Sequence, residues 1–139
     1  MVRNGLTEKA DIAILGDKIE RIAADIQPAD NDKVYDCTGL TIMSGLVDLH
    51  VHLREPGFSA KETIATGTAA AAHGGFTTVC SMPNLAPAPD SMANLQQQLD
   101  IIERDAVNKV LPYATITRKR FGDELVNFEE LKPYVAGFS

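Results

Sequence analysis

Residues 45–81 read GLVDLHVHLREPGFSAKETIATGTAAAAHGGFTTVCS, and this stretch decides the fold. Its first part, residues 45–52, is predicted to be a strand, which begins at Gly45 and ends at His52. Residues 60–73 have the composition of a helix and stop at a pair of glycines, a typical C-terminal signal. Residues 76–81 are rich in aromatic and β-branched side chains, which favour a strand. The stretch therefore predicts a strand–helix–strand unit.

The same alternation continues along the chain. A helix with apolar side chains at helical spacing follows the second strand, and Asp90 or Ser91 can cap it. Residues 110–116 are predicted to be a third strand, residues 123–132 a third helix, and residues 134–138 a fourth strand. This order is typical of βαβ units in a parallel α/β sheet.

Two layouts of such a sheet are open: a doubly wound sheet and a (β/α)₈ TIM barrel. No GxGxxG follows the first strand, so the fingerprint of a dinucleotide-binding sheet is absent. A complete barrel requires about 250 residues. The 95 residues that follow position 44 in this 139-residue chain would supply about four of the eight strands.

Residues 1–44 have a different pattern, made of short candidate strands. Residues 11–15 and 18–22 flank a Gly-Asp pair that suits a tight hairpin turn. Two more candidates, residues 33–36 and 40–43, follow a polar stretch. These strands are too few and too short for an independent sandwich, so we expect a small β layer that needs further strands from elsewhere.

Composition excludes some classes of function. Thirteen basic against nineteen acidic residues give a net charge of −6, which argues against a nucleic-acid surface. Residues 63–89 contain no charged side chain, but their prolines and glycine pair exclude a membrane-spanning helix. The N-terminus has no apolar signal core, and Cys37 and Cys80 are expected to be reduced thiols of a cytoplasmic protein.

The first predicted strand ends in two histidines, within DLHVHLRE (residues 48–55). Because side chains of a strand alternate, Asp48, His50 and His52 are expected on one face and the intervening apolar residues on the other. Two neutral imidazoles at the carboxyl end of a parallel strand can bind a divalent cation such as zinc. The alternative is that both are ordinary core histidines.

Polar residues also follow the ends of the first two strands. Arg54 offers a planar fork for a substrate carboxylate, unless it forms an ion pair with Glu55. Asn84 could donate to the same ligand or could stabilise a turn with Pro83, and spacing alone favours the turn. His73 ends a helix beside two glycines and is interpreted as a capping or surface residue.

These residues carry a family resemblance. The segments GLVDLHVHLREPG and KETIATGTAAAAHGGFTTVCSMPN resemble dihydroorotases, which are cyclic amidohydrolases. The resemblance is close over residues 45–84 and looser on both sides. The DxHxH element is similar to that of the whole amidohydrolase superfamily. The continuation HLREPG and the MPN segment are more specific, because related allantoinases and hydantoinases usually lack the arginine.

The resemblance implies a fold and a metal site. Residues 45–139 would form the first half of a (β/α)₈ TIM barrel, with strands 1–4. Residues 1–44 would form the N-terminal part of a small β-sandwich domain. His50 and His52 would be ligands of one or two zinc ions.

The resemblance also implies an activity. Arg54 and Asn84 would hold the carboxylate of (S)-dihydroorotate, which is hydrolysed reversibly to N-carbamoyl-L-aspartate in de novo pyrimidine biosynthesis. The implied assembly is a homodimer in the cytoplasm, with aspartate transcarbamoylase as a further candidate partner. The alternatives are a related hydantoinase or allantoinase, and a non-catalytic pseudo-dihydroorotase that serves as a scaffold for that partner.

The remaining ligands of the implied site are not matched in these residues. In the family they come from the fourth and later strands, as does an aspartate that shuttles the proton. Neither Asp48 nor His73 matches those positions. We therefore expect the sequence to be part of a longer chain, with no catalytic base of its own and no turnover by itself.

Overall fold

The computed structural model describes residues 2–3 and 5–139. Contacts along the chain divide it into two compact units, Met1–Ser44 and Gly45–Ser139. The first unit contains short antiparallel strand pairs, and the second contains a parallel sheet with helices.

The strands of the first unit form two antiparallel pairs, β1 (Val2–Arg3) with β2 (Leu6–Thr7) and β3 (Asp11–Leu15) with β4 (Lys18–Ala23). Gly16, at φ 63°, turns the chain between β3 and β4, which is the geometry expected of a tight hairpin. Apolar side chains of this hairpin, such as Ile14 and Ile19, are exposed. The hairpin therefore lacks an apolar covering layer among the described residues of the first unit.

Two strand predictions for the first unit are wrong. Residues 33–36 and 40–43 form no strand, and none occurs anywhere in residues 24–45. Their side chains, including Tyr35 and Leu40, are largely exposed. A strand is stable only when its backbone groups are paired and one face is buried. Neither condition is met here, although the residue types favour strands.

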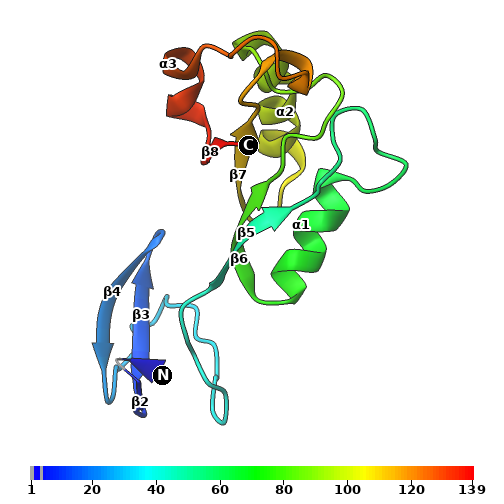
Figure 1. The fold of residues 1–139 in the computed structure, drawn as a ribbon. Coiled ribbons are helices and arrows are strands. Elements are labelled where there is room, and N and C mark those ends of the chain that lie inside the picture. The colour runs from blue at the N-terminus through cyan, green and yellow to red at the C-terminus, as the bar shows by residue number, and fades with distance from the viewer. Residues whose placement is uncertain (1, 4) are drawn as a thin grey trace. The chain divides into compact units, whose positions relative to one another are not determined.

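The second unit is built on four parallel strands, β5 (Leu46–Val51), β6 (Phe76–Ser81), β7 (Lys109–Ala114) and β8 (Gly137–Phe138). They lie side by side in chain order (Figure 1). In a doubly wound sheet, the order in which strands are added would reverse, so that later strands lie on the other side of the first strand. Uninterrupted chain order is the winding of a (β/α)₈ barrel, so the α/β fold predicted as the first half of such a barrel is confirmed.

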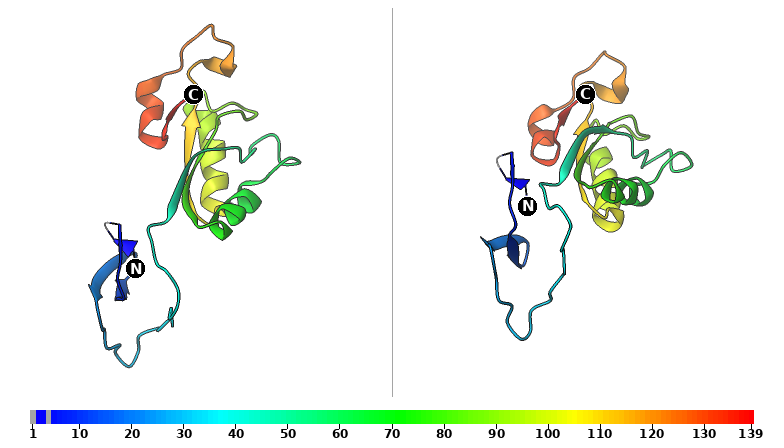
Figure 2. Two further views of the ribbon diagram at one scale, coloured as in Figure 1. Left: turned by 60° about the horizontal axis from the view of Figure 1, so that its bottom comes forward. Right: turned by 90° about the horizontal axis from the view of Figure 1, so that it is seen from below.

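Helices connect these strands: α1 (Ile64–His73), α2 (Met92–Asp105), α3 (Phe128–Leu131) and the short 3₁₀ segments η1 (Arg118–Arg120) and η2 (Lys132–Tyr134). Thr63 caps α1 through a capping box with Thr66, and Ser91 caps α2. Helices α1 and α2 lie along the same side of the sheet (Figures 1 and 2).

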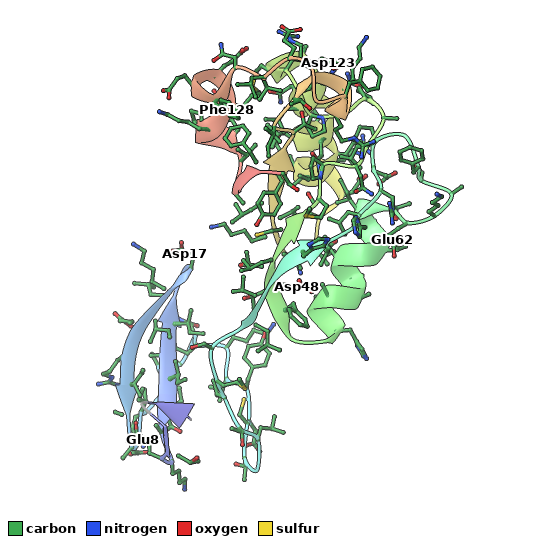
Figure 3. The ribbon with its side chains drawn as sticks, viewed as in Figure 1. Glu8, Asp17, Asp48, Glu62, Asp123 and Phe128 are labelled. Atoms are coloured by element: carbon green, nitrogen blue, oxygen red, sulfur yellow. The ribbon has the colours of Figure 1, made fainter. Side chains whose placement is uncertain are left out.

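The core lies between the sheet and this helical side. One cluster of buried side chains joins β6 and β7 to α1, and its members are Leu53, Ile64, Val79 and Val110. A second joins β7 to α2 and α3, and its members are Leu95, Ala114, Val126 and Leu131. Phe128 of α3, labelled in Figure 3, stacks edge-on against Phe138, with ring centroids 4.8 Å apart. One face of the sheet is thus closed by apolar packing.

The third helix is much shorter than predicted, because residues 123–126 pair with the chain before them. Arg118 N–H donates to Glu124 O at 2.8 Å, and Val126 N–H donates to Ile116 O at 3.1 Å. A backbone committed to this small ladder cannot also form helical bonds. The helix begins only after Asn127, which caps it by accepting from Glu130 N–H.

The charge-poor segment is part of the α/β unit, and neither cysteine forms a disulfide. Residues 63–89 contain α1, β6 and the loop after it. None of the described helices is long and apolar enough to cross a membrane. Cys37 and Cys80 are both free thiols, the first exposed and the second buried.

Candidate metal and substrate site

The two histidines lie where β5 ends. Val51 and Leu53 pack into the helical core, whereas His50 and His52, which alternate with them along the chain, are exposed. The pairing register with β6 shifts between Asp48 and Val51. Leu49 was expected on the apolar face but is 65% exposed, because it falls within this irregular segment of β5.

Asp48 stabilises this irregular segment from the same strand (labelled in Figure 3). Its carboxylate accepts a hydrogen bond from the backbone N–H of His50 at 2.9 Å. The contact fixes the backbone that carries the first imidazole, which gives Asp48 a supporting role.

The two imidazole rings lie together. Their centroids are 5.2 Å apart and their planes meet at 76°. The ring nitrogen Nδ1 of His52 is 2.9 Å from Oδ1 of Asn84. Since an amide oxygen only accepts, Nδ1 carries the proton and donates, which leaves the Nε2 lone pair of a neutral His52 ring free for a ligand. Metal-binding histidines are commonly held in this way by a partner on the other nitrogen.

The side chain of Asn84 makes a contact that its spacing in the sequence did not indicate. The turn at Pro83 is made by the backbone, since Leu85 N–H donates to Pro83 O at 2.9 Å. The Asn84 side chain is left to contact His52, 32 positions earlier in the chain. No local pattern could reveal that contact, because it depends on β5 and β6 being neighbours.

The loop after β5 holds Arg54 in an unusual conformation. Arg54 has φ 66°, a left-handed value that is uncommon for a residue with a side chain and often marks a functional position. Its carbonyl accepts from Phe58 N–H at 2.9 Å, which closes a tight turn. Within the part of the chain that the structure describes, the guanidinium has no ion-pair partner.

Glu55 does not pair with Arg54, which was the alternative considered for that arginine. Its carboxylate accepts from the backbone N–H of Ile64 at 2.8 Å, at the first turn of α1. A carboxylate is favoured there by the free N–H groups and the helix dipole. Sequence reasoning missed this anchor, although an acid shortly before a predicted helix is a usable signal.

Cys80 lies beside Asp48 but is not a reactive thiol. Burial raises the pKa of the Cys80 thiol, and the nearby carboxylate of Asp48 raises it further. The thiol therefore remains protonated at neutral pH and is a poor nucleophile or metal ligand.

The donor set at this face fits part of a zinc site. Two neighbouring imidazoles match zinc chemistry, but catalytic zinc takes three protein ligands and an open position. Across residues 2–3 and 5–139, no group of three or more His, Cys, Asp or Glu side chains could hold a metal ion. His73, at the exposed end of α1, leads into the opposite, amino end of β6.

A family model described as dihydro-orotase-like matches residues 39–138. The chain belongs to the dihydroorotase-like family. The family resemblance predicted from the DLHVHLRE and MPN segments is thereby confirmed.

Curated dihydroorotases resemble the chain along nearly all its length. One from Staphylococcus aureus (strain Mu50 / ATCC 700699) is 49% identical over 131 residues, which cover 94% of this chain and 31% of that protein. One from Fusobacterium nucleatum subsp. nucleatum is 45% identical over 139 residues, or 100% of this chain and 32% of that protein. The chain thus spans about a third of the length of these dihydroorotase-like relatives.

A solved structure supports the fold of the dihydroorotase-like chain. The L-hydantoinase (dihydropyrimidinase) from Arthrobacter aurescens superposes with a TM-score of 0.80. The match covers 97% of this chain and 29% of that one, at 24% sequence identity. This likeness concerns the fold alone and agrees with the chain-order parallel sheet.

Proposed function

We propose that the full-length protein containing this chain is a dihydroorotase, which hydrolyses (S)-dihydroorotate reversibly to N-carbamoyl-L-aspartate with the help of zinc. The observation that carries the proposal is the His50–His52 pair at the carboxyl end of β5, with Asn84 bonded to His52. This constellation occurs in a chain that is 45% to 49% identical to proteins named dihydroorotase. The reaction belongs to de novo pyrimidine biosynthesis.

His50 and His52 would hold the metal. Asp48 fixes the backbone of His50, and Asn84 keeps the Nε2 atom of His52 available. A bound zinc ion would supply Lewis acidity, which activates water and polarises the ring carbonyl. The remaining ligands and the general base would come from parts of the protein outside these residues.

Arg54 and Asn84 would hold the substrate carboxylate. The planar guanidinium of Arg54 can donate two parallel hydrogen bonds to a carboxylate. Asn84 uses its oxygen to accept from His52, so its Nδ2 amino group remains to donate. One side chain would thereby connect the metal ligand with the substrate.

A second candidate function is hydrolysis of a hydantoin-like or allantoin-like ring. It is favoured by the likeness of the fold to L-hydantoinase, and Arg54 argues against it. A non-catalytic scaffold is a third candidate, which has no evident need for a paired and oriented His50 and His52.

An assay of the purified full-length protein with dihydroorotate and with hydantoin separates these candidates. We expect hydrolysis of dihydroorotate, weak or no hydrolysis of hydantoin, and loss of activity on removal of zinc by a chelator. A preference for hydantoin would favour the second candidate. Failure to hydrolyse either ring with zinc present would favour the scaffold.

The assembly of the full-length protein is also a proposal. We infer a cytoplasmic homodimer, with aspartate transcarbamoylase as a candidate partner of the same metabolic route. Light scattering after size-exclusion chromatography, with and without that enzyme, measures both associations. A monomer that does not bind the enzyme would contradict this assembly.

A further inference from the structure

The loops that follow β5 and β6 touch at one close backbone contact. Ala86 N–H donates to Pro56 O at 3.2 Å. Gly57, which follows Pro56, has φ 100° and lies directly against Ala86. A Cβ atom at position 57 would fall 2.3 Å from Ala86 O and 2.7 Å from Ala86 Cβ. The two loops can approach this closely because residue 57 has no side chain.

Each loop also has an anchor of its own, in addition to the hydrogen bond from His52 to Asn84 that joins them close to the strand ends. Glu55 fixes the first loop to the N-terminus of α1 through Ile64 N–H. Leu85, which is 4% exposed, fixes the second loop in the protein interior. The contact between residues 56–57 and Ala86 therefore joins two loops that each carry one proposed substrate ligand, Arg54 and Asn84.

We propose that Gly57 is a positioning residue, whose contact with Ala86 sets the spacing between Arg54 and Asn84 for the substrate carboxylate. This inference rests on the proposed dihydroorotase function and assigns to Gly57 a part of its substrate specificity. Gly57 itself does not touch the substrate.

A methyl group at position 57 tests this role. Contacts of a Cβ atom below 3.0 Å essentially never occur, and the blocking atoms include the backbone oxygen of Ala86. The loops must therefore separate by roughly 1 Å, a displacement that can cost about 100-fold in the efficiency of a positioned reaction. The proposed metal ligands His50 and His52 precede the displaced segment on the chain, so metal binding should persist although the bond from His52 to Asn84 lengthens.

Gly75 provides a matched control. It has φ 84°, similar to that of Gly57, but nothing lies within 4 Å of a Cβ atom there. It lies before the amino end of β6, away from the loops that follow the carboxyl ends. Gly75→Ala therefore introduces the same kind of backbone strain without separating the loops.

The experiment compares the full-length wild-type protein with Gly57→Ala, Gly75→Ala and Ala86→Val. It measures kcat and KM for dihydroorotate, bound zinc by elemental analysis, and the melting temperature. We expect Gly57→Ala to raise KM about 10- to 100-fold, with bound zinc unchanged and a smaller effect on kcat. Gly75→Ala should lower the melting temperature and leave KM at the wild-type value.

Ala86→Val enlarges the side chain on the other loop. Because Ala86 is exposed, this variant should fold, and it provides the test if Gly57→Ala does not fold. It should raise KM in the same direction. An unchanged KM in the folded Gly57→Ala or Ala86→Val protein, or an equal rise in Gly75→Ala, would overturn the inference. A wild-type protein without dihydroorotase activity would instead refute the proposed function, and the inference with it.

Discussion

The hydrogen bond from His52 to Asn84 connects the metal half of the candidate site with its substrate half. That the rings of His50 and His52 lie close together could be predicted, because residues two apart on a strand point the same way. The partner of His52 could not be predicted, because Asn84 meets it only when β5 and β6 pair. The same holds for Glu55, whose contact with Ile64 N–H depends on how the loop folds back.

At the residue scale, Arg54→Ala should weaken binding of dihydroorotate. A charge-assisted contact to the carboxylate is worth about 1.5–3 kcal/mol, which corresponds to a rise of about 10- to 150-fold in KM. Steady-state kinetics of the full-length protein measure the change. Arg104→Ala is the control, since Arg104 is exposed on α2 and paired with Asp105. Unchanged KM and kcat in Arg54→Ala would remove Arg54 from the site.

At the scale of the elements, the local sequence pattern correctly predicted the helices and strands that pack within one βα unit. Helix α1 and the strands β5 to β7 agree with their predicted ranges to within a few residues, and α2 is capped by Ser91, one of its two predicted caps. The failures share one physical cause, which is that tertiary pairing decides the outcome. Residues 123–126 are held by the backbone of residues 116–118, and residues 33–36 find no strand to pair with.

Asp90 joins two of these elements. It is 6% exposed, and its carboxylate accepts from Asn94 Nδ2 at 2.7 Å and from Lys119 N–H at 2.8 Å. Burial alone would raise the pKa of Asp90, but the hydrogen bonds from Lys119 and Asn94 bring it below the ordinary value. The start of α2 is thus tied to the loop after β7.

Asp90→Asn should lower the free energy of unfolding of the full-length protein by about 1–3 kcal/mol at neutral pH, because one buried donor loses its acceptor. A carboxyl group whose pKa is lower in the folded state stabilises the fold at pH values above its unfolded pKa of about 3.9. This stabilisation is lost as the pH falls through the folded pKa. The difference between wild type and variant should therefore shrink in acid.

Urea denaturation at neutral pH and near pH 3 measures the effect of Asp90→Asn. Asp100→Asn is its control, since Asp100 is exposed on α2 and accepts from Gln96 of the same helix. The control should change stability by less than about 0.5 kcal/mol. A difference for Asp90→Asn that stays constant or grows in acid would contradict the assigned role of the carboxylate.

At the scale of the whole molecule, strand order was the feature that sequence could not supply. Hydrophobic pattern indicated a parallel sheet but left the barrel and the doubly wound sheet open, because both are built from the same βα units. The order β5-β6-β7-β8 resolved this. It also explains why the candidate site residues gather at one edge, since every loop after a strand of the barrel opens on the same side.

The central claim is that His50 and His52 hold a catalytic zinc ion in the full-length protein. The most direct test measures bound zinc and dihydroorotate hydrolysis in the wild-type protein, in His50→Ala and in His52→Ala. The control is His73→Ala, at the exposed end of α1. We predict that the wild-type and His73→Ala proteins bind zinc and are active, and that each site variant loses activity together with zinc. Full activity in a zinc-free His50→Ala/His52→Ala protein would contradict the claim.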